Sequence, residues 1–175
     1  MKIGFIGTGV MGGAIAEHLL DAGHELVVYN RTKAKTDALV AKGATWVETP
    51  AQVAEKTDII FSMVGYPTDV EAIYFGDQGI FSTLTAGKTV IDMTTSTPTL
   101  AEKIAVKARA LNAHALDAPV SGGDVGAKNA TLTVMVGGDQ ATFDAVKPLF
   151  ELVGSKVHLF GPAGKGQHTK MLIRS

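Results

Sequence analysis

The chain of 175 residues contains no cysteine. Disulfides, thiolate nucleophiles and thiolate metal sites are therefore excluded. An excess of charge of one sign is also missing, because 16 Lys and Arg balance 17 Asp and Glu. This balance gives no support for nucleic-acid binding or for a polybasic membrane anchor. The five histidines show no spacing typical of a metal site, and we assign no metal.

Long hydrophobic runs are missing as well. No segment approaches the roughly 20 apolar residues that a membrane-spanning helix needs. The opening stretch MKIGFIGTGV has the lysine and apolar residues of a signal peptide, but Gly4, Gly7 and Gly9 interrupt it. We interpret it as the first strand of a cytoplasmic domain. The length suits one domain with a sizeable core.

Short apolar runs alternate with segments of helical periodicity. The predicted strands are residues 2–6, 26–29, 58–64, 89–93, 113–116, 131–136 and 156–160. Most early runs are apolar throughout, as in strands that are covered on both faces. The helical stripes cover residues 11–20, 100–111 and 143–150, the second entered through Pro98 and the third with Asp139 as N-cap. This alternation predicts a doubly wound α/β domain with a mostly parallel sheet and helices on both faces.

A glycine-rich loop follows the first predicted strand. Its sequence, Gly7-Thr8-Gly9-Val10-Met11-Gly12, fits G-x-G-x-x-G and opens a predicted helix. In a dinucleotide-binding loop Gly7 makes the tight turn, Gly9 admits the pyrophosphate and Gly12 lets the helix pack on the strand. The helix N-terminus adds unpaired N–H groups. We interpret the loop as a dinucleotide site; the alternative is a merely tight turn between strand and helix.

The end of the second strand favours one dinucleotide over the other. An NAD site usually has Asp or Glu about 20 residues after the glycine loop, where it holds the ribose 2′-hydroxyl. This sequence has Asn30, Arg31 and Thr32 there. A guanidinium pairs with a 2′-phosphate that a carboxylate would repel. The residues favour NADP(H), with NAD(H) possible; the alternative is that Arg31 is an ordinary exposed residue.

Four blocks in one order carry a resemblance that covers the chain to about Lys170. They are GFIGTGVMGGAIAEHLL, IDMTTSTP, DAPVSGG and GKGQHTK, and together they resemble the β-hydroxyacid dehydrogenase family. The resemblance implies an NAD(P)-binding Rossmann domain over residues 1–163 and a truncated start of the interdomain helix over 164–175. By the same resemblance, we expect the family's all-helical C-terminal domain to be absent from this chain. The implied reaction is hydride transfer between NADP(H) and a small β-hydroxy acid or its semialdehyde.

The resemblance also assigns roles to individual residues. Gly7, Gly9, Met11 and Gly12 match the cofactor loop, and Thr95 matches a position beside the nicotinamide. Lys170 matches the catalytic lysine, which would act as general acid and base.

The block Ser121-Gly122-Gly123 matches the contact with the substrate carboxylate. Independently of the resemblance, a hydroxyl next to consecutive glycine N–H groups can form an anion-binding nest. The alternative interpretation of this block is a glycine-rich turn. Met63 and Val64 are expected to form an apolar wall beside the cofactor. Asp117 is expected to fix its loop through backbone hydrogen bonds rather than to act as an acid.

The sequence departs from the family just after the lysine. Ile173 and Arg174 stand where the family typically has amides, and Ser175 is the last residue. We therefore expect cofactor binding, self-association through the face left open by the missing domain, and little dehydrogenase activity. The alternative is a catalytically inactive dinucleotide-binding module. A methyltransferase that uses S-adenosylmethionine is a third interpretation, which the VSGG and lysine blocks disfavour.

Overall fold

The computed structural model describes residues 2–174, so that Ser175 of the predicted interdomain segment lies outside the described residues. The strands are β1 (Lys2–Ile6), β2 (Glu25–Tyr29), β3 (Thr45–Trp46), β4 (Ile59–Ser62), β5 (Thr89–Asp92), β6 (His114–Asp117), β7 (Val120–Ser121), β8 (Leu132–Gly137) and β9 (Gly154–Gly161). The helices are α1 (Val10–Asp21), α2 (Asp37–Ala41), α3 (Pro50–Lys56), α4 (Pro67–Phe75), α5 (Pro98–Ala110), α6 (Gly123–Asn129), α7 (Gln140–Phe150) and α8 (Lys165–Arg174). Two short 3₁₀ helices cover Lys33–Thr36 and Ile80–Ser82.

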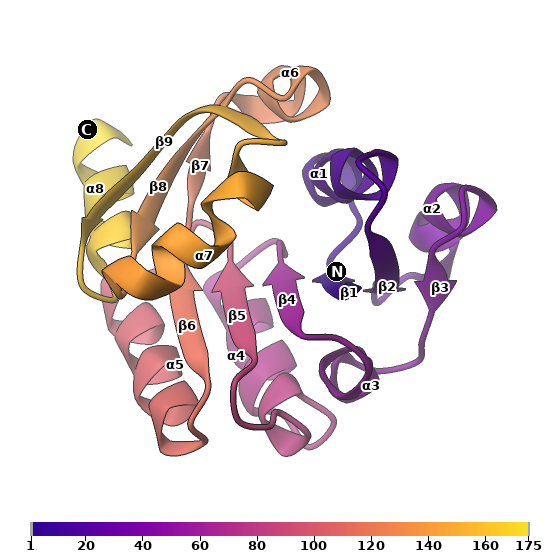
Figure 1. Cartoon of the computed structure of the whole chain (residues 1–175), viewed down its shortest axis with the longest axis horizontal. Coiled ribbons are helices and arrows are strands. Elements are labelled where there is room, and N and C mark those ends of the chain that lie inside the picture. The colour runs from indigo at the N-terminus through magenta and orange to yellow at the C-terminus, as the bar shows by residue number, and fades with distance from the viewer. Residues whose placement is uncertain (1, 175) are drawn as a thin grey trace.

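The strands form one sheet in the order β3-β2-β1-β4-β5-β6-β8-β7, with β9 paired to β8. Strands β1 to β6 run parallel to one another, whereas β8 runs antiparallel to β6 and β7. The predicted α/β fold with a mostly parallel sheet is confirmed (Figure 1). The chain leaves β1 toward β2 and later returns to β4 on the other side of β1. This reversal is the switch point at which open α/β sheets bind ligands.

Two apolar layers hold the helices on the two faces of the sheet. One joins the sheet to α1 through Ile15 and Leu19 and to α7 through Phe143 and Phe150. The other joins it to α3, α4 and α5 through Val53, Val70, Tyr74, Leu100 and Ile104. Figure 1 shows α3, α4 and α5 along the opposite side of the sheet from α1 and α7. Strands between two such layers are apolar throughout, as the sequence predicted for β1 and β4.

Several short elements were not predicted from periodicity. The helices α2, α3, α4 and α6 have at most nine residues, and β3 and β7 have two each. Such elements are too short to show a clear period. Proline at the first helical turn marks α3 and α4, as it marks the predicted α5, and Thr49 and Thr97 cap α3 and α5. Asp139 lies at the N-cap of α7, but its side chain makes no capping hydrogen bond.

Candidate functional site

The three glycines of the loop after β1 meet different surroundings. Gly7 has a φ of 98°, and a Cβ there would collide with the carbonyl oxygen of Met63. A Cβ at Gly12 would collide with the carbonyl oxygen of Gly7. At Gly9, in contrast, no protein atom lies within 4 Å of an added Cβ. The fold therefore requires Gly7 and Gly12, whereas the space above Gly9 is open to a ligand.

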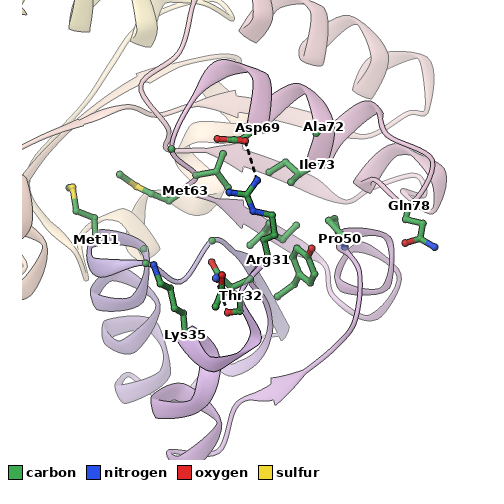
Figure 2. Close-up of a pocket in the computed structure, with 18 residues that line it drawn as sticks. Met11, Arg31, Thr32, Lys35, Pro50, Met63, Asp69, Ala72, Ile73 and Gln78 are labelled. Atoms are coloured by element: carbon green, nitrogen blue, oxygen red, sulfur yellow. Dashed lines mark hydrogen bonds and ion pairs between the residues drawn. The ribbon is translucent and has the colours of Figure 1, made fainter.

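An open pocket of about 600 Å³ lies over this loop at the switch point between β1 and β4. Predicted cofactor residues that line it are Gly7, Gly9, Met11, Gly12, Asn30, Arg31, Thr32, Met63 and Val64. The pocket also includes residues that sequence reasoning missed, namely Lys35, Pro50, Asp69, Ala72, Ile73 and Gln78 (Figure 2). The structure thus brings the ends of β1, β2 and β4 together around one cavity.

Thr8 and Val10 belong to the loop but do not line the pocket. The backbone N–H of Thr8 donates to Asn30 Oδ1 at 2.9 Å, and its hydroxyl donates to the carbonyl of Lys35 at 2.9 Å. Asn30 in turn donates to the carbonyl of Thr32 at 2.9 Å. These bonds fix the loop to the segment after β2. Val10 is 74% exposed.

Two cations and one acid line the pocket. Arg31, whose side chain is 87% exposed, extends toward Asp69 of α4, with 3.9 Å between guanidinium and carboxylate (Figure 2). The other oxygen of Asp69 accepts the backbone N–H of Tyr66 at the start of α4. Lys35 points toward the start of α1 (Figure 2). Arg31 and Lys35 do not share a helix, because the 3₁₀ helix begins only at Lys33, and no spacing rule in the sequence relates them.

The predicted substrate residues lie elsewhere in the fold. Ser121 ends β7, and Gly122 and Gly123 follow with φ values of 131° and 61°. Lys170 is in the second turn of α8, and its Nζ donates to the carbonyl of Val120 at 2.9 Å. The lysine thus lies beside the strand that carries Ser121. None of these residues, nor Thr95, lines the 600 Å³ pocket.

Two buried carboxyl groups lie at the ends of adjacent strands. Asp92 accepts the hydroxyl of Ser62 at 2.8 Å, and burial raises the pKa of its carboxyl to about 6. Asp117 accepts the backbone N–H groups of Gly164 at 2.8 Å and Gln167 at 3.0 Å. Burial also raises the pKa of Asp117. Asp117 therefore makes the expected backbone hydrogen bonds, and they fix the start of α8.

Residues 2–174 contain neither a candidate metal site nor a candidate membrane span. This part of the chain contains no group of three or more acidic, histidine or cysteine residues arranged to hold a metal ion. None of its helices combines the length and the apolar character that crossing a membrane requires.

Comparison with known proteins gives a consistent result. The family model described as the NAD binding domain of 6-phosphogluconate dehydrogenase matches residues 2–161. The uncharacterized oxidoreductase YkwC of Bacillus subtilis is 53% identical over 97% of this chain and 59% of its own length. The 2-hydroxy-3-oxopropionate reductase of Escherichia coli is 46% identical over 98% of this chain and 58% of its own length.

Solved structures share the same architecture. The structure described as Psf3 in complex with NADP+ and 2-OPP superposes with a TM-score of 0.93 at 31% identity. The superposition covers 98% of this chain and 61% of that one. This chain thus spans less than two thirds of the length of each of these proteins. On the family match, the sequence identities and the shared fold, the chain belongs to the β-hydroxyacid dehydrogenase family and corresponds to its NAD-binding domain.

Proposed function

We propose that this chain is the NADP(H)-binding domain of an oxidoreductase that transfers hydride between the nicotinamide and a small β-hydroxy acid or its semialdehyde. The observation that carries the proposal is the open space above Gly9, in a loop whose other two glycines the fold requires. A glycine at which an added Cβ would meet no other part of the protein has no packing reason to be glycine. A ligand that approaches the backbone supplies that reason.

The pocket fits a dinucleotide in chemistry as well as in shape. Its floor is the N-terminus of α1, where backbone N–H groups and the helix dipole favour a pyrophosphate. Met63 and Val64 offer an apolar wall for the part of the cofactor that carries the nicotinamide. At the other end, Arg31 and Lys35 are two cations near the ribose position, where an NAD site usually has a carboxylate.

Asp69 is the one acid that lines this pocket among the described residues, and it bears on the choice of cofactor. It belongs to α4, across the pocket from the end of β2, and one of its oxygens is engaged by the backbone of Tyr66. Its contact with Arg31 is long and largely exposed, so it holds the guanidinium only weakly. A 2′-phosphate, which can accept two hydrogen bonds from one guanidinium, would displace this contact.

Lys170 and the Ser121–Gly123 segment supply the groups for the reaction. A nicotinamide held in this domain would supply the chemistry of hydride transfer to and from the substrate carbon. In oxidation, the neutral amine of Lys170 would accept the proton of the substrate hydroxyl; in reduction, the ammonium would return it to the carbonyl oxygen. The hydroxyl of Ser121 and the N–H groups that follow it would hold the substrate carboxylate. Thr95 would lie beside the nicotinamide, between residues that the fold fixes from both sides.

The cofactor preference is tested by fluorescence titration with NADPH and NADH at one fixed salt concentration. We expect NADPH to bind at least tenfold more tightly, which is about 1.4 kcal/mol. Arg31→Ala should remove most of this difference, whereas Arg109→Ala, at an exposed position in the last turn of α5, should leave it unchanged. Equal affinities in the unmodified chain would contradict the assignment to NADP(H).

The reaction, the assembly and the location are further parts of the proposal. Turnover of small β-hydroxy acids with NADP+ tests the reaction, and cofactor binding without turnover would instead identify an inactive dinucleotide-binding module.

Three consecutive exposed apolar residues on α8, Met171, Leu172 and Ile173, support self-association through this helix. We also propose a cytoplasmic protein, because the stretch that suggested a signal peptide supplies the central strand β1.

A further inference from the structure

Gln167 joins two parts of the fold that lie far apart in the sequence. Its side chain is buried in the first turn of α8. The amide nitrogen donates to the carbonyl of Thr94 at 2.7 Å, and the amide oxygen accepts the backbone N–H of Ser96 at 2.9 Å. One side chain therefore holds both neighbours of Thr95, the residue expected beside the nicotinamide.

The backbone of Gln167 is fixed as firmly as its side chain. Its N–H donates to Asp117 at 3.0 Å, and the same carboxylate accepts the N–H of Gly164 at 2.8 Å. Asp117 thereby caps the start of α8 from the end of β6. Lys170 follows three residues later on the same helix, and its amine reaches the carbonyl of Val120. The position of the lysine thus depends on how the first turn of α8 is held.

The same network continues from Thr94 to the wall of the pocket. The hydroxyl of Thr94 accepts the backbone N–H of Val64 at 3.0 Å, and Val64 lines the pocket. The backbone N–H of Thr94 donates to Asp92 at 3.3 Å, which also accepts the hydroxyl of Ser62. Hydrogen bonds between buried and half-buried groups therefore run without a break from the proposed cofactor wall to α8.

The chemistry of the position explains why an amide stands there. Thr94 presents a carbonyl and Ser96 an N–H, so that the side chain between them must donate and accept at once. A glutamine does both without charge. A methionine of similar length would leave both backbone groups unpaired in a buried place, and an ionised glutamate would offer no donor to Thr94.

We propose that Gln167 is a positioning residue that couples occupancy of the cofactor pocket to the placement of Lys170. A cofactor that fixes Val64 and the Thr94–Ser96 segment would, through Gln167, also fix the first two turns of α8. This inference rests on the proposed function. Coupling of this kind predicts a change at α8 that depends on the cofactor.

The test is hydrogen–deuterium exchange of the full chain with and without saturating NADPH. In the unmodified chain we expect NADPH to slow exchange in the glycine loop and, at least threefold, in the α8 amides. In Gln167→Met the protection of the loop should remain, with NADPH affinity within about threefold of the unmodified chain, while the protection of α8 is lost. Gln140→Met, at an exposed glutamine of α7, serves as the matched control.

A second variant separates coupling from a general loss of structure. Gln167→Glu should lack coupling when the glutamate is ionised, and it should regain coupling as the pH is lowered, because a protonated carboxyl both donates and accepts. Each pH is compared with and without NADPH, so that the intrinsic exchange rate cancels. If Gln167→Met fails to fold, this variant carries the test alone.

The outcomes distinguish this inference from the proposed function. Protection of the glycine loop without protection of α8 in the unmodified chain would overturn the coupling and leave cofactor binding intact. Retention of α8 protection in Gln167→Met, or in Gln167→Glu at every pH, would also overturn the coupling and leave cofactor binding intact. A chain in which NADPH protects neither segment and does not bind would overturn both proposals.

Discussion

Replacement of Gly9 by alanine should separate cofactor binding from folding. The added methyl group meets no protein atom within 4 Å, and the φ of −67° and ψ of −162° at this residue are open to alanine. As an N-cap, alanine is poorer than glycine, but it also restricts the unfolded chain by about 0.4–1 kcal/mol. These effects oppose each other, so we expect the free energy of unfolding to change by less than about 1 kcal/mol.

The effect on the cofactor should be larger than the effect on the fold. The methyl group occupies the space that a pyrophosphate needs above the loop. Forcing a methyl group into filled space typically costs about 1–3 kcal/mol, which corresponds to a roughly 5- to 150-fold weaker affinity for NADPH. Urea denaturation measures the stability of the variant, and fluorescence titration measures its affinity for NADPH.

Gly12→Ala is the matched comparison within the same loop. Its methyl group would collide with the carbonyl oxygen of Gly7, which is backbone and cannot rotate away. We expect a loss of about 3 kcal/mol or more in the free energy of unfolding. The reasoning would be refuted if Gly9→Ala bound NADPH as tightly as the unmodified chain, or if it unfolded as readily as Gly12→Ala.

Three further predictions concern the buried acid, the lysine and the exposed end of α8. Burial raises the pKa of Asp92 from 3.8 to about 6, so the folded state keeps a proton that the unfolded state releases. The free energy of unfolding should therefore fall by about 1.4 kcal/mol from this group as the pH rises from 5 to 7.5, and Asp92→Asn should remove that part of the pH dependence in urea titrations. Lys170→Ala should abolish any turnover of β-hydroxy acids and leave NADPH affinity unchanged; activity that survives it would refute the role of the lysine. Joint replacement of Met171 and Leu172 by serine should lower self-association in sedimentation velocity, whereas Val106→Ser, at a residue of α5 that is 65% exposed, should not.

The parts of the fold that the sequence predicted are those with local signals. The glycine loop could be predicted because Gly7–Gly12 contains all of its signals: the tight turn, the close approach of a ligand to the backbone, and the start of the helix. The buried strands could be predicted because apolar layers cover both of their faces, so that their sequences are almost continuous runs of apolar residues. The direction of β8 was not predicted, because an apolar run of this length is compatible with either a parallel or an antiparallel neighbour.

The parts that were missed depend on contacts over long sequence distances. Asp69 approaches Arg31 only after α4 has packed beside β4, and no spacing in the sequence relates the two. Gln167 was within a recognised block, yet its partners Thr94 and Ser96 lie more than 70 positions earlier. Hydrogen bonds between a buried side chain and distant backbone N–H and carbonyl groups have no periodic signature in the sequence, so only the folded structure assigns the partners.

This difference in sequence distance gives the two ends of the site different sensitivities. The cofactor end consists of the loop after β1 and the residue run after β2, tied together by the hydrogen bond of Thr8 to Asn30. Its geometry follows from β1 and β2, which pair along five residues each. The lysine end depends instead on one helix start that Asp117 and Gln167 attach to β6 and to the segment after β5. Weakening those contacts should leave cofactor binding in place while it displaces Lys170, and even a small misplacement of a reacting group reduces catalysis strongly. We therefore expect cofactor affinity and turnover to respond to different sets of substitutions. Measuring both quantities on each variant distinguishes a domain that only binds the cofactor from one that also positions the proton donor.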